Sequence, residues 1–217
     1  MSGFDPMTDM MADQIAKLFT ARDGTYLFAR WGRPIVPVVF GTDDATLAIV
    51  KGAIEAVVVL AGHKMAETDP ELGANLMMFF FRDWAELPVV PGLDRLVPDL
   101  ANLCGRLADK DANQYRLFRF DPDGTIKAAF VFVRMDPALQ MMDAGDLALC
   151  QAAEVICLWS DAAFAGTSPL ARLDGQAVLR PDIAAVIRAG YARVMPAVAR
   201  DPSHAYRLAA RLKTAFV

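Results

Sequence analysis

Apolar and polar residues follow each other at two different spacings along this chain, and each spacing predicts a kind of secondary structure. In the segments 9–20, 44–61 and 93–107, apolar side chains recur every three or four residues, which predicts amphipathic helices. The same spacing returns from residue 180 onward and again over residues 203–216. Each of these predicted helices has one apolar face that needs an apolar surface to cover it.

Short apolar runs between these segments predict β-strands. Pro37 has no N–H for a sheet, so the first of these strands is expected at a sheet edge. The run that ends at Phe81 is almost continuously apolar, which is typical of a central strand covered on both faces. The sequence Asp-Pro-Asp-Gly at 121–124 predicts a tight turn between two strands. The strands are expected at residues 35–40, 75–81, 115–120 and 126–133.

One further helix, predicted over residues 145–159, is apolar nearly all round and is therefore expected in the interior. Beyond Asp146 in its first turn it holds a single carboxylate, Glu154, and Gln151 lies one turn before it on the same side. Burying a carboxylate without a partner costs several kcal/mol, so Glu154 needs a partner. Two interpretations stay open: a hydrogen-bonded structural residue, or a general base or ligand-binding carboxylate in a cleft.

The order of these elements predicts an α+β fold. We expect a single domain over residues 1–217 with a small mixed sheet, helices packed on one face, and a helical C-terminal part over 180–217. The methionine-rich helix at 9–20 is expected to pack on a second copy of the chain, which predicts a homo-oligomer. Residues 160–179 are expected to form a long loop without secondary structure.

Composition narrows the classes of protein that fit. The 217 residues are 55% hydrophobic and 22% charged, so the chain can bury a substantial core. The net charge of −4 gives no general footprint for nucleic acid. The N-terminal residues lack an export signal, and no apolar stretch is long enough to span a membrane. Three cysteines in apolar settings indicate free thiols in a reducing compartment. We therefore expect a cytoplasmic protein that binds neither nucleic acid nor a membrane.

The sequence lacks the residues that several familiar kinds of functional site require. The two histidines, His63 and His204, are far apart along the chain, and both are expected at the surface. The sequence therefore holds no motif-spaced metal site. It holds neither a glycine-rich phosphate loop nor a serine nucleophile elbow. We accordingly expect no metal and no cofactor.

The C-terminal part is locally basic. Between residues 172 and 213, eight Lys and Arg residues face only three Asp residues. The interpretation that we favour is a pair of solvated helix faces, and the alternative is a surface for an anionic ligand. In that alternative, a pocket is framed by two tryptophans and the basic helices. The binding residues would be Trp84, Trp159, Arg180 and Arg188.

Four segments carry a resemblance to a known family. They are residues 29–36, 73–80, 149–158 and 180–191. In order and spacing they resemble a bacterial family of predicted lipoproteins with a zincin-like domain of unknown function, over about residues 29–200. In that alignment Glu154 matches the glutamate of the zinc-protease helix motif, while Ala153 and Cys157 occupy the two metal-ligand positions. The family's lipid-bearing cysteine has no counterpart here, because no cysteine precedes Cys104.

The resemblance implies a zincin-like scaffold that has lost its metal. The function that we expect is a non-catalytic, protein- or peptide-binding or scaffold domain. One alternative is a hydrolase of unfamiliar type in which Glu154 is the general base and Gln151 orients it. The other alternative is the small-molecule domain with the anionic ligand described above.

Overall fold

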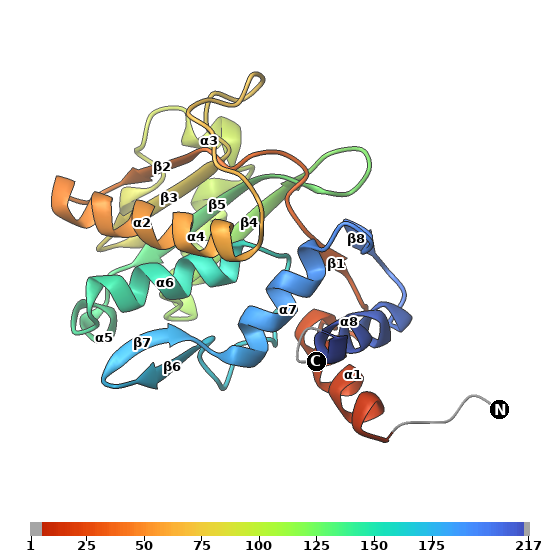
Figure 1. Cartoon of the computed structure of the whole chain (residues 1–217). Coiled ribbons are helices and arrows are strands. Elements are labelled where there is room, and N and C mark those ends of the chain that lie inside the picture. The colour runs from red at the N-terminus through yellow and green to blue at the C-terminus, as the bar shows by residue number, and fades with distance from the viewer. Residues whose placement is uncertain (1–5, 215–217) are drawn as a thin grey trace.

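The computed structural model describes residues 6–214 and shows one mixed sheet with helices around it (Figure 1). The helices are α1 (Pro6–Phe19), α2 (Asp44–Leu60), the short 3-10 helix η1 (Trp84–Glu86), α3 (Leu93–Leu96), α4 (Leu100–Asp109), α5 (Pro137–Gln140), α6 (Ala144–Val155), α7 (Pro181–Tyr191) and α8 (Ser203–Thr214). The strands are β1 (Phe28–Ala29), β2 (Pro37–Phe40), β3 (Leu76–Phe81), β4 (Gln114–Phe120), β5 (Ile126–Arg134), β6 (Leu170–Leu173), β7 (Gln176–Leu179) and β8 (Val198–Ala199).

The main sheet has four strands in the order β2-β3-β5-β4. Strands β2, β3 and β5 run parallel, and β4 pairs antiparallel with β5 through the predicted hairpin. The strand that begins at Pro37 lies at an edge and β3 lies in the interior of the sheet, as the sequence predicts. The mixed sheet and the α+β class are therefore confirmed.

Helices cover both faces of this sheet, which extends the prediction of helices on one face. The long helices α2 and α6 pack against each other and cover the face that carries Met78 and Val131. The short helices η1, α3 and α4 cover the other face, which carries Phe79 and Phe132. Both layers exist because successive residues of a strand point to opposite faces, and these strands are apolar on both.

The N-terminal helix packs on the C-terminal part of its own chain. Helix α1 lies beside α8 in Figure 1, and its residues Ile15 and Phe19 are buried. Strands β1 and β8 form a small antiparallel pair in the same region. Part of the apolar face of α1 is thus covered within the chain, while Met10 is 59% exposed, and the packing of this helix on a second copy stays a prediction.

The predicted helix at 93–107 is broken in two. Helix α3 ends at Leu96 and α4 begins at Leu100, with Val97 in an extended conformation between them. Pro98 disfavours a helical conformation in the residue before it, which explains the break. Asp99 then takes a left-handed conformation with φ of 56°. The face covered by these helices consequently receives a thinner layer than the other face.

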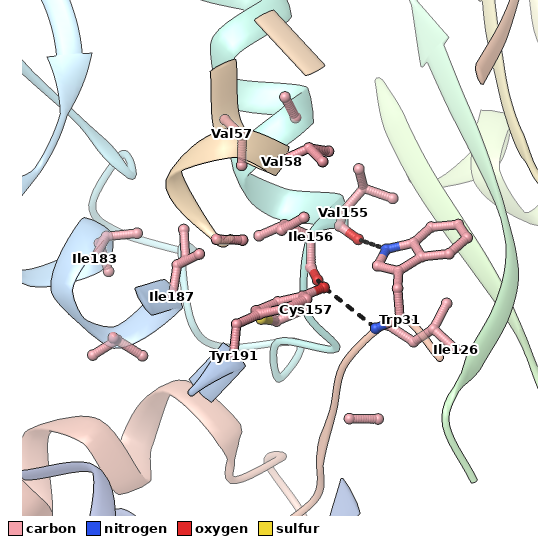
Figure 2. Close-up of a cluster of buried hydrophobic side chains, with 14 of the residues drawn as sticks. Trp31, Val57, Val58, Ile126, Val155, Ile156, Cys157, Ile183, Ile187 and Tyr191 are labelled. Atoms are coloured by element: carbon pink, nitrogen blue, oxygen red, sulfur yellow. Dashed lines mark hydrogen bonds between the residues drawn. The ribbon is translucent and has the colours of Figure 1, made fainter. Parts of the chain in front are cut away.

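The predicted helix at 145–159 is also too long, because α6 ends at Val155. Its last carbonyl groups accept hydrogen bonds from aromatic side chains: Trp31 Nε1 lies 2.9 Å from Val155 O, and the Tyr191 hydroxyl lies 2.7 Å from Ile156 O (Figure 2). Cys157 follows in an extended segment that bridges to Arg30. Ala153 and Cys157 therefore do not share one helix face.

The predicted loop at 160–179 contains a hairpin. Strands β6 and β7 pair across the turn Asp174–Gly175, in which both residues have positive φ, 49° and 82°. The dipeptide Asp-Gly is a strong signal for a two-residue hairpin turn, because glycine adopts positive φ without a steric penalty. The prediction of a loop without secondary structure over residues 160–179 is wrong, because it did not take the Asp-Gly turn into account.

Candidate binding groove at the carboxyl ends of the parallel strands

The carboxylate of Glu154 belongs to a closed polar cluster between α6 and β4. Its Oε2 atom lies 2.8 Å from Arg116 Nη1, and the side chains of Arg116 and Glu154 are only 18% and 14% exposed. Cys150 Sγ lies 3.0 Å from the other carboxylate oxygen. Since burial and the neighbouring carboxylate both raise the pKa of the Cys150 thiol, that thiol stays protonated and can donate.

Gln151 completes the same cluster. It is fully buried, its Oε1 accepts from Arg116 Nη2 at 2.7 Å, and its Nε2 donates to Gln114 Oε1 at 2.9 Å. The amide and the carboxylate from α6 thus hold one guanidinium group from β4. This geometry favours the structural interpretation of Glu154 and Gln151, because their polar atoms are already engaged by protein groups.

The two candidate tryptophans lie on opposite faces of the sheet. Trp84 is buried beside Phe81 under the short helices, and its Nε1 donates to Ala112 O at 2.7 Å. Trp159 packs with the other apolar cluster, where its ring stacks on Phe19 with centroids 5.1 Å apart. One pocket cannot be framed by both indoles, since the sheet separates them.

The two candidate arginines also differ in their surroundings. Arg180 forms an ion pair with Asp182 at the start of α7, and its Nη1 donates to Ser168 O at 3.3 Å. Arg188 is solvent-exposed on the same helix. The structure therefore brings neither of them to a tryptophan, and Arg180 already has a carboxylate partner.

The two histidines differ from their predicted surface positions. His204, on α8, is only 3% exposed, with its ring against Tyr26 and Phe28 and its Nδ1 2.8 Å from the Tyr26 hydroxyl. Burial lowers the pKa of His204 to about 4, and the charge of Arg207 adds to that effect. His63 is half-buried, and burial lowers its pKa too. Over residues 6–214, no group of three or more His, Cys, Asp or Glu side chains is placed to hold a metal ion.

A hollow at the carboxyl ends of β2, β3 and β5 was not found by sequence reasoning. Its deepest part is a cavity of about 370 Å³ between the N-terminal ends of α2 and α6. Two shallower hollows adjoin it and share lining residues with it. We call the three together the strand-end groove. In open sheets with parallel strands, ligands commonly bind at this end of the strands.

The floor of the strand-end groove is apolar and rich in methionine. Its main residues are Val50, Phe80, Met135, Leu139, Met142 and Leu147. Beside the floor, Met141 is 87% exposed and Met142 is 40% exposed, and Ile49 is exposed next to them. Exposed apolar side chains that gather beside a hollow indicate an interaction surface.

Gly41 permits the close approach of two strands at the groove. It has φ of 83°, and a Cβ atom there would lie 1.9 Å from Phe80 O. Only glycine fits such a position without a backbone shift. The chain turns there from β2 into α2, so this residue shapes one wall of the groove.

The rim of the groove is acidic. Four carboxylates line it (Asp43, Glu86, Asp143, Asp146), against the two guanidinium groups of Arg82 and Arg172. Arg172 forms an ion pair with Asp146, which leaves three carboxylates and Arg82. The rim thus carries net negative charge.

These carboxylates cap the segments that follow the strands. Asp43 accepts from Thr46 N at 2.7 Å, and Asp143 accepts from Gly145 N at 2.8 Å. Glu86 accepts from the backbone N–H groups of Arg82 and Asp83. The hydrogen bond from Thr46 lowers the pKa of Asp43, which keeps that carboxylate charged. Carboxylates cap many helix starts, so a capping residue in a sequence does not by itself indicate a groove. Only the fold brings these capping carboxylates to one rim.

Comparison with known proteins adds no relative to this picture. No family model, no curated protein and no solved structure matches the chain. Over residues 6–214, no helix has both the length and the apolar character required to cross a membrane. The argument for function therefore depends on the geometry and charge of the sites.

Proposed function

We propose that this protein is a binding domain whose strand-end groove takes an apolar, positively charged segment of a partner polypeptide. The observation that carries the proposal is the combination of a methionine-rich floor with an acidic rim in one groove. This keeps the expected class of protein- or peptide-binding domain and assigns it a surface that the sequence did not indicate.

The floor supports a polypeptide partner. Methionine side chains are flexible and polarisable, so they adapt to apolar side chains of different shape. Met135, Met141 and Met142 come from the connection between β5 and α6; Met135 and Met142 line the cavity of about 370 Å³, and Met141 lines the hollow that adjoins it. A hollow of that size accommodates one or two large apolar side chains of a bound segment.

The rim supports a positive charge on that partner. Asp43, Glu86 and Asp143 line the groove and have no ion-pair partner among residues 6–214. Their capping hydrogen bonds come from neutral backbone groups, so their negative charge is not cancelled. Lysine or arginine residues beside the apolar anchors would meet a complementary potential.

The same hydrogen bonds favour binding over catalysis. A general base needs a free lone pair directed at its substrate and a pKa close to the working pH. Asp43 is held by Thr46, and Asp136, beside the groove, is held by Leu139 N at 2.8 Å and Asn113 Nδ2 at 2.8 Å. Those hydrogen bonds lower the pKa of both carboxyl groups.

Titration calorimetry with two model peptides tests the proposal. The first is an amphipathic helical peptide of leucine and lysine, and the second has glutamate in place of every lysine. We expect the lysine peptide to bind one site and the glutamate peptide to bind at least about tenfold more weakly. Equal affinity for both peptides, or no saturable binding of the lysine peptide, would contradict the proposal.

Matched variants locate the binding. The double variant Met141→Ser with Met142→Ser removes exposed apolar groups at the groove, and we expect it to weaken the lysine peptide about tenfold. The control is Val89→Ser with Val194→Ser, which removes exposed apolar groups elsewhere. If both double variants lose the same affinity, the binding is non-specific and the groove is not the site.

A further inference from the structure

A second cavity lies on the other face of the sheet, toward the amino ends of β3 and β5. Its volume is about 720 Å³, and its floor is formed by Met77, Ala128 and Phe130. The side chains of Leu72, Leu96 and Phe120 are exposed around it. We call it the basic cavity, for the reason given below.

The basic cavity exists because the short helices cover this face incompletely. Helix α3 has only four residues, and the chain leaves the helical conformation at Val97 before Pro98. The side chains toward the carboxyl ends of the strands, Phe79 and Phe81, are buried under η1 and α4. Met77, near the amino end of β3, is only half-buried. An apolar floor therefore stays open to a ligand.

Three cationic side chains line this cavity. They are Arg95 from α3, Arg119 from β4 and Lys127 from β5. Arg119 Nη2 donates to Leu96 O at 2.9 Å, which holds its guanidinium group across the cavity and leaves its other N–H groups for a ligand. Arg95 has no ion-pair partner within residues 6–214.

One carboxylate lies near these cations. Glu71 forms ion pairs with Lys127 and with Arg33, at 3.2 Å for the arginine. Arg33 in turn holds Asp121 and Asp69. Glu71 thus neutralises Lys127, while Arg95 and Arg119 line the cavity without an ion-pair partner among residues 6–214.

We infer that the basic cavity binds an anionic amphiphile with a single apolar chain, of the chemical class of long-chain carboxylates. The carboxylate lies between the guanidinium groups of Arg95 and Arg119, which hold such groups through charge-assisted hydrogen bonds. The chain lies on Met77 and Phe130, with Phe120 beside it. A cavity of about 720 Å³ is within the usual range for small-molecule sites.

This inference does not depend on the strand-end groove. The two hollows lie at opposite ends of the parallel strands and have opposite charge. A ligand with a carboxylate is disfavoured by the acidic rim and favoured by the basic cavity. The two proposals can therefore fail separately.

Calorimetric titration with dodecanoate, below the concentration at which it forms micelles, tests the inference. Dodecanol has the same chain without the charge, and an acidic peptide of aspartate and phenylalanine represents the competing occupant. We expect saturable binding of dodecanoate at one site, about tenfold tighter than dodecanol. If dodecanol binds as tightly, or if only the acidic peptide binds, the inference is wrong.

Arginine variants test whether the two guanidinium groups bind the carboxylate of the ligand or whether any loss of positive charge weakens binding. In the double variant Arg95→Gln with Arg119→Gln, we expect dodecanoate to bind about tenfold more weakly and dodecanol to be unaffected. Both side chains are exposed, so the variant should fold, and a circular dichroism spectrum like that of the unchanged protein would check this. The control Arg188→Gln removes an exposed arginine on α7. Equal loss in the control, or no loss in the double variant, would overturn the inference.

Discussion

The polar cluster around Glu154 and the strand-end groove lie at two sides of α6 and have opposite properties. In the cluster, Arg116 is held by Glu154 and Gln151, whose polar atoms are engaged inside the protein, while Arg116 Nε is buried without a hydrogen-bond partner among residues 6–214. In the groove, the side chains of Met141 and Met142 are exposed and the carboxylates of the rim keep their charge. An unusual buried residue is therefore no better an indicator of a functional site than ordinary residues that the fold leaves exposed.

The comparison predicts that changes in the cluster alter stability and that changes in the groove alter binding. Four variants, one of them a double substitution, test the structural roles of these and other residues, from the largest expected effect on the free energy of unfolding to the smallest. Urea denaturation followed by circular dichroism measures all of them, at a single pH except for His204.

Arg116→Ala should have the largest effect. It leaves the carboxylate of Glu154 and the amide of Gln151 without their partner, which should cost about 4 kcal/mol of unfolding free energy. The control is Arg22→Ala, which breaks an ion pair whose side chains are 72% and 55% exposed and should cost under about 1 kcal/mol. Similar losses in both variants would show that the cluster is not a buried structural unit.

Gly41→Ala should come next. The new Cβ would lie 1.9 Å from Phe80 O, so the backbone at the groove wall must shift, at a cost of about 3 kcal/mol. Gly24 has a similar φ of 87° but open space around it, so Gly24→Ala should cost only about 1 kcal/mol. The difference between the two variants measures the cost of the close approach between Gly41 and Phe80. Equal losses of unfolding free energy in both variants would contradict this interpretation.

His204 should make stability depend on pH. Burial lowers its pKa from 6.5 to about 4, so the unfolded chain takes up the proton more readily. The contribution of neutral His204 to the free energy of unfolding is then fully present above pH 6.5 and is lost as the pH drops toward 4. The loss is about 1 kcal/mol at pH 5.5. His204→Asn keeps a partner for the Tyr26 hydroxyl and removes the titration. An unchanged loss between pH 7.5 and 5.5 in this variant would contradict the assignment.

Met141→Ser with Met142→Ser should have the smallest effect on stability. Both side chains are exposed, so we expect a change within about 0.5 kcal/mol. Together with the expected loss of peptide affinity, this result would separate binding from folding. A loss of stability as large as that of Gly41→Ala would place these methionines in the core instead.

Much of the fold could be predicted from the sequence, because local patterns determine it. The continuous apolar run of β3 and the turn at 121–124 each depend on a few neighbouring residues. The errors occurred where a local breaker or a distant partner decides the outcome. Pro98 broke a helix, and hydrogen bonds from Trp31 and Tyr191 accompany the end of α6, although both residues are distant in sequence.

The site was harder to predict, because grooves are made by the tertiary arrangement. Nothing in the sequence placed Met142 in the same groove as Asp43. Glu154 drew attention as a carboxylate in the middle of an apolar helix, and its partner Arg116 lies on a separate strand.

The resemblance to the zincin-like family stays a prediction. One feature weighs against its metal-site alignment: α6 ends at Val155, so the second ligand position, Cys157, lies in an extended segment beside Arg30. Two ligands one turn apart must both lie on the helix to face one metal ion. The helix itself is buried against α2 and the sheet, as the resemblance implies.

The most direct test of the proposed function is nuclear magnetic resonance of methyl-labelled methionine, since the chain has 11 methionines, several of which line the two hollows or lie in the core. On addition of the leucine-lysine peptide, we predict that the methyl signals of Met135, Met141 and Met142 shift in a saturable manner. The signals of Met77 in the basic cavity and of the buried Met195 should stay in place. Shifts confined to Met77, or no saturable shift at the three groove methionines, would contradict the account.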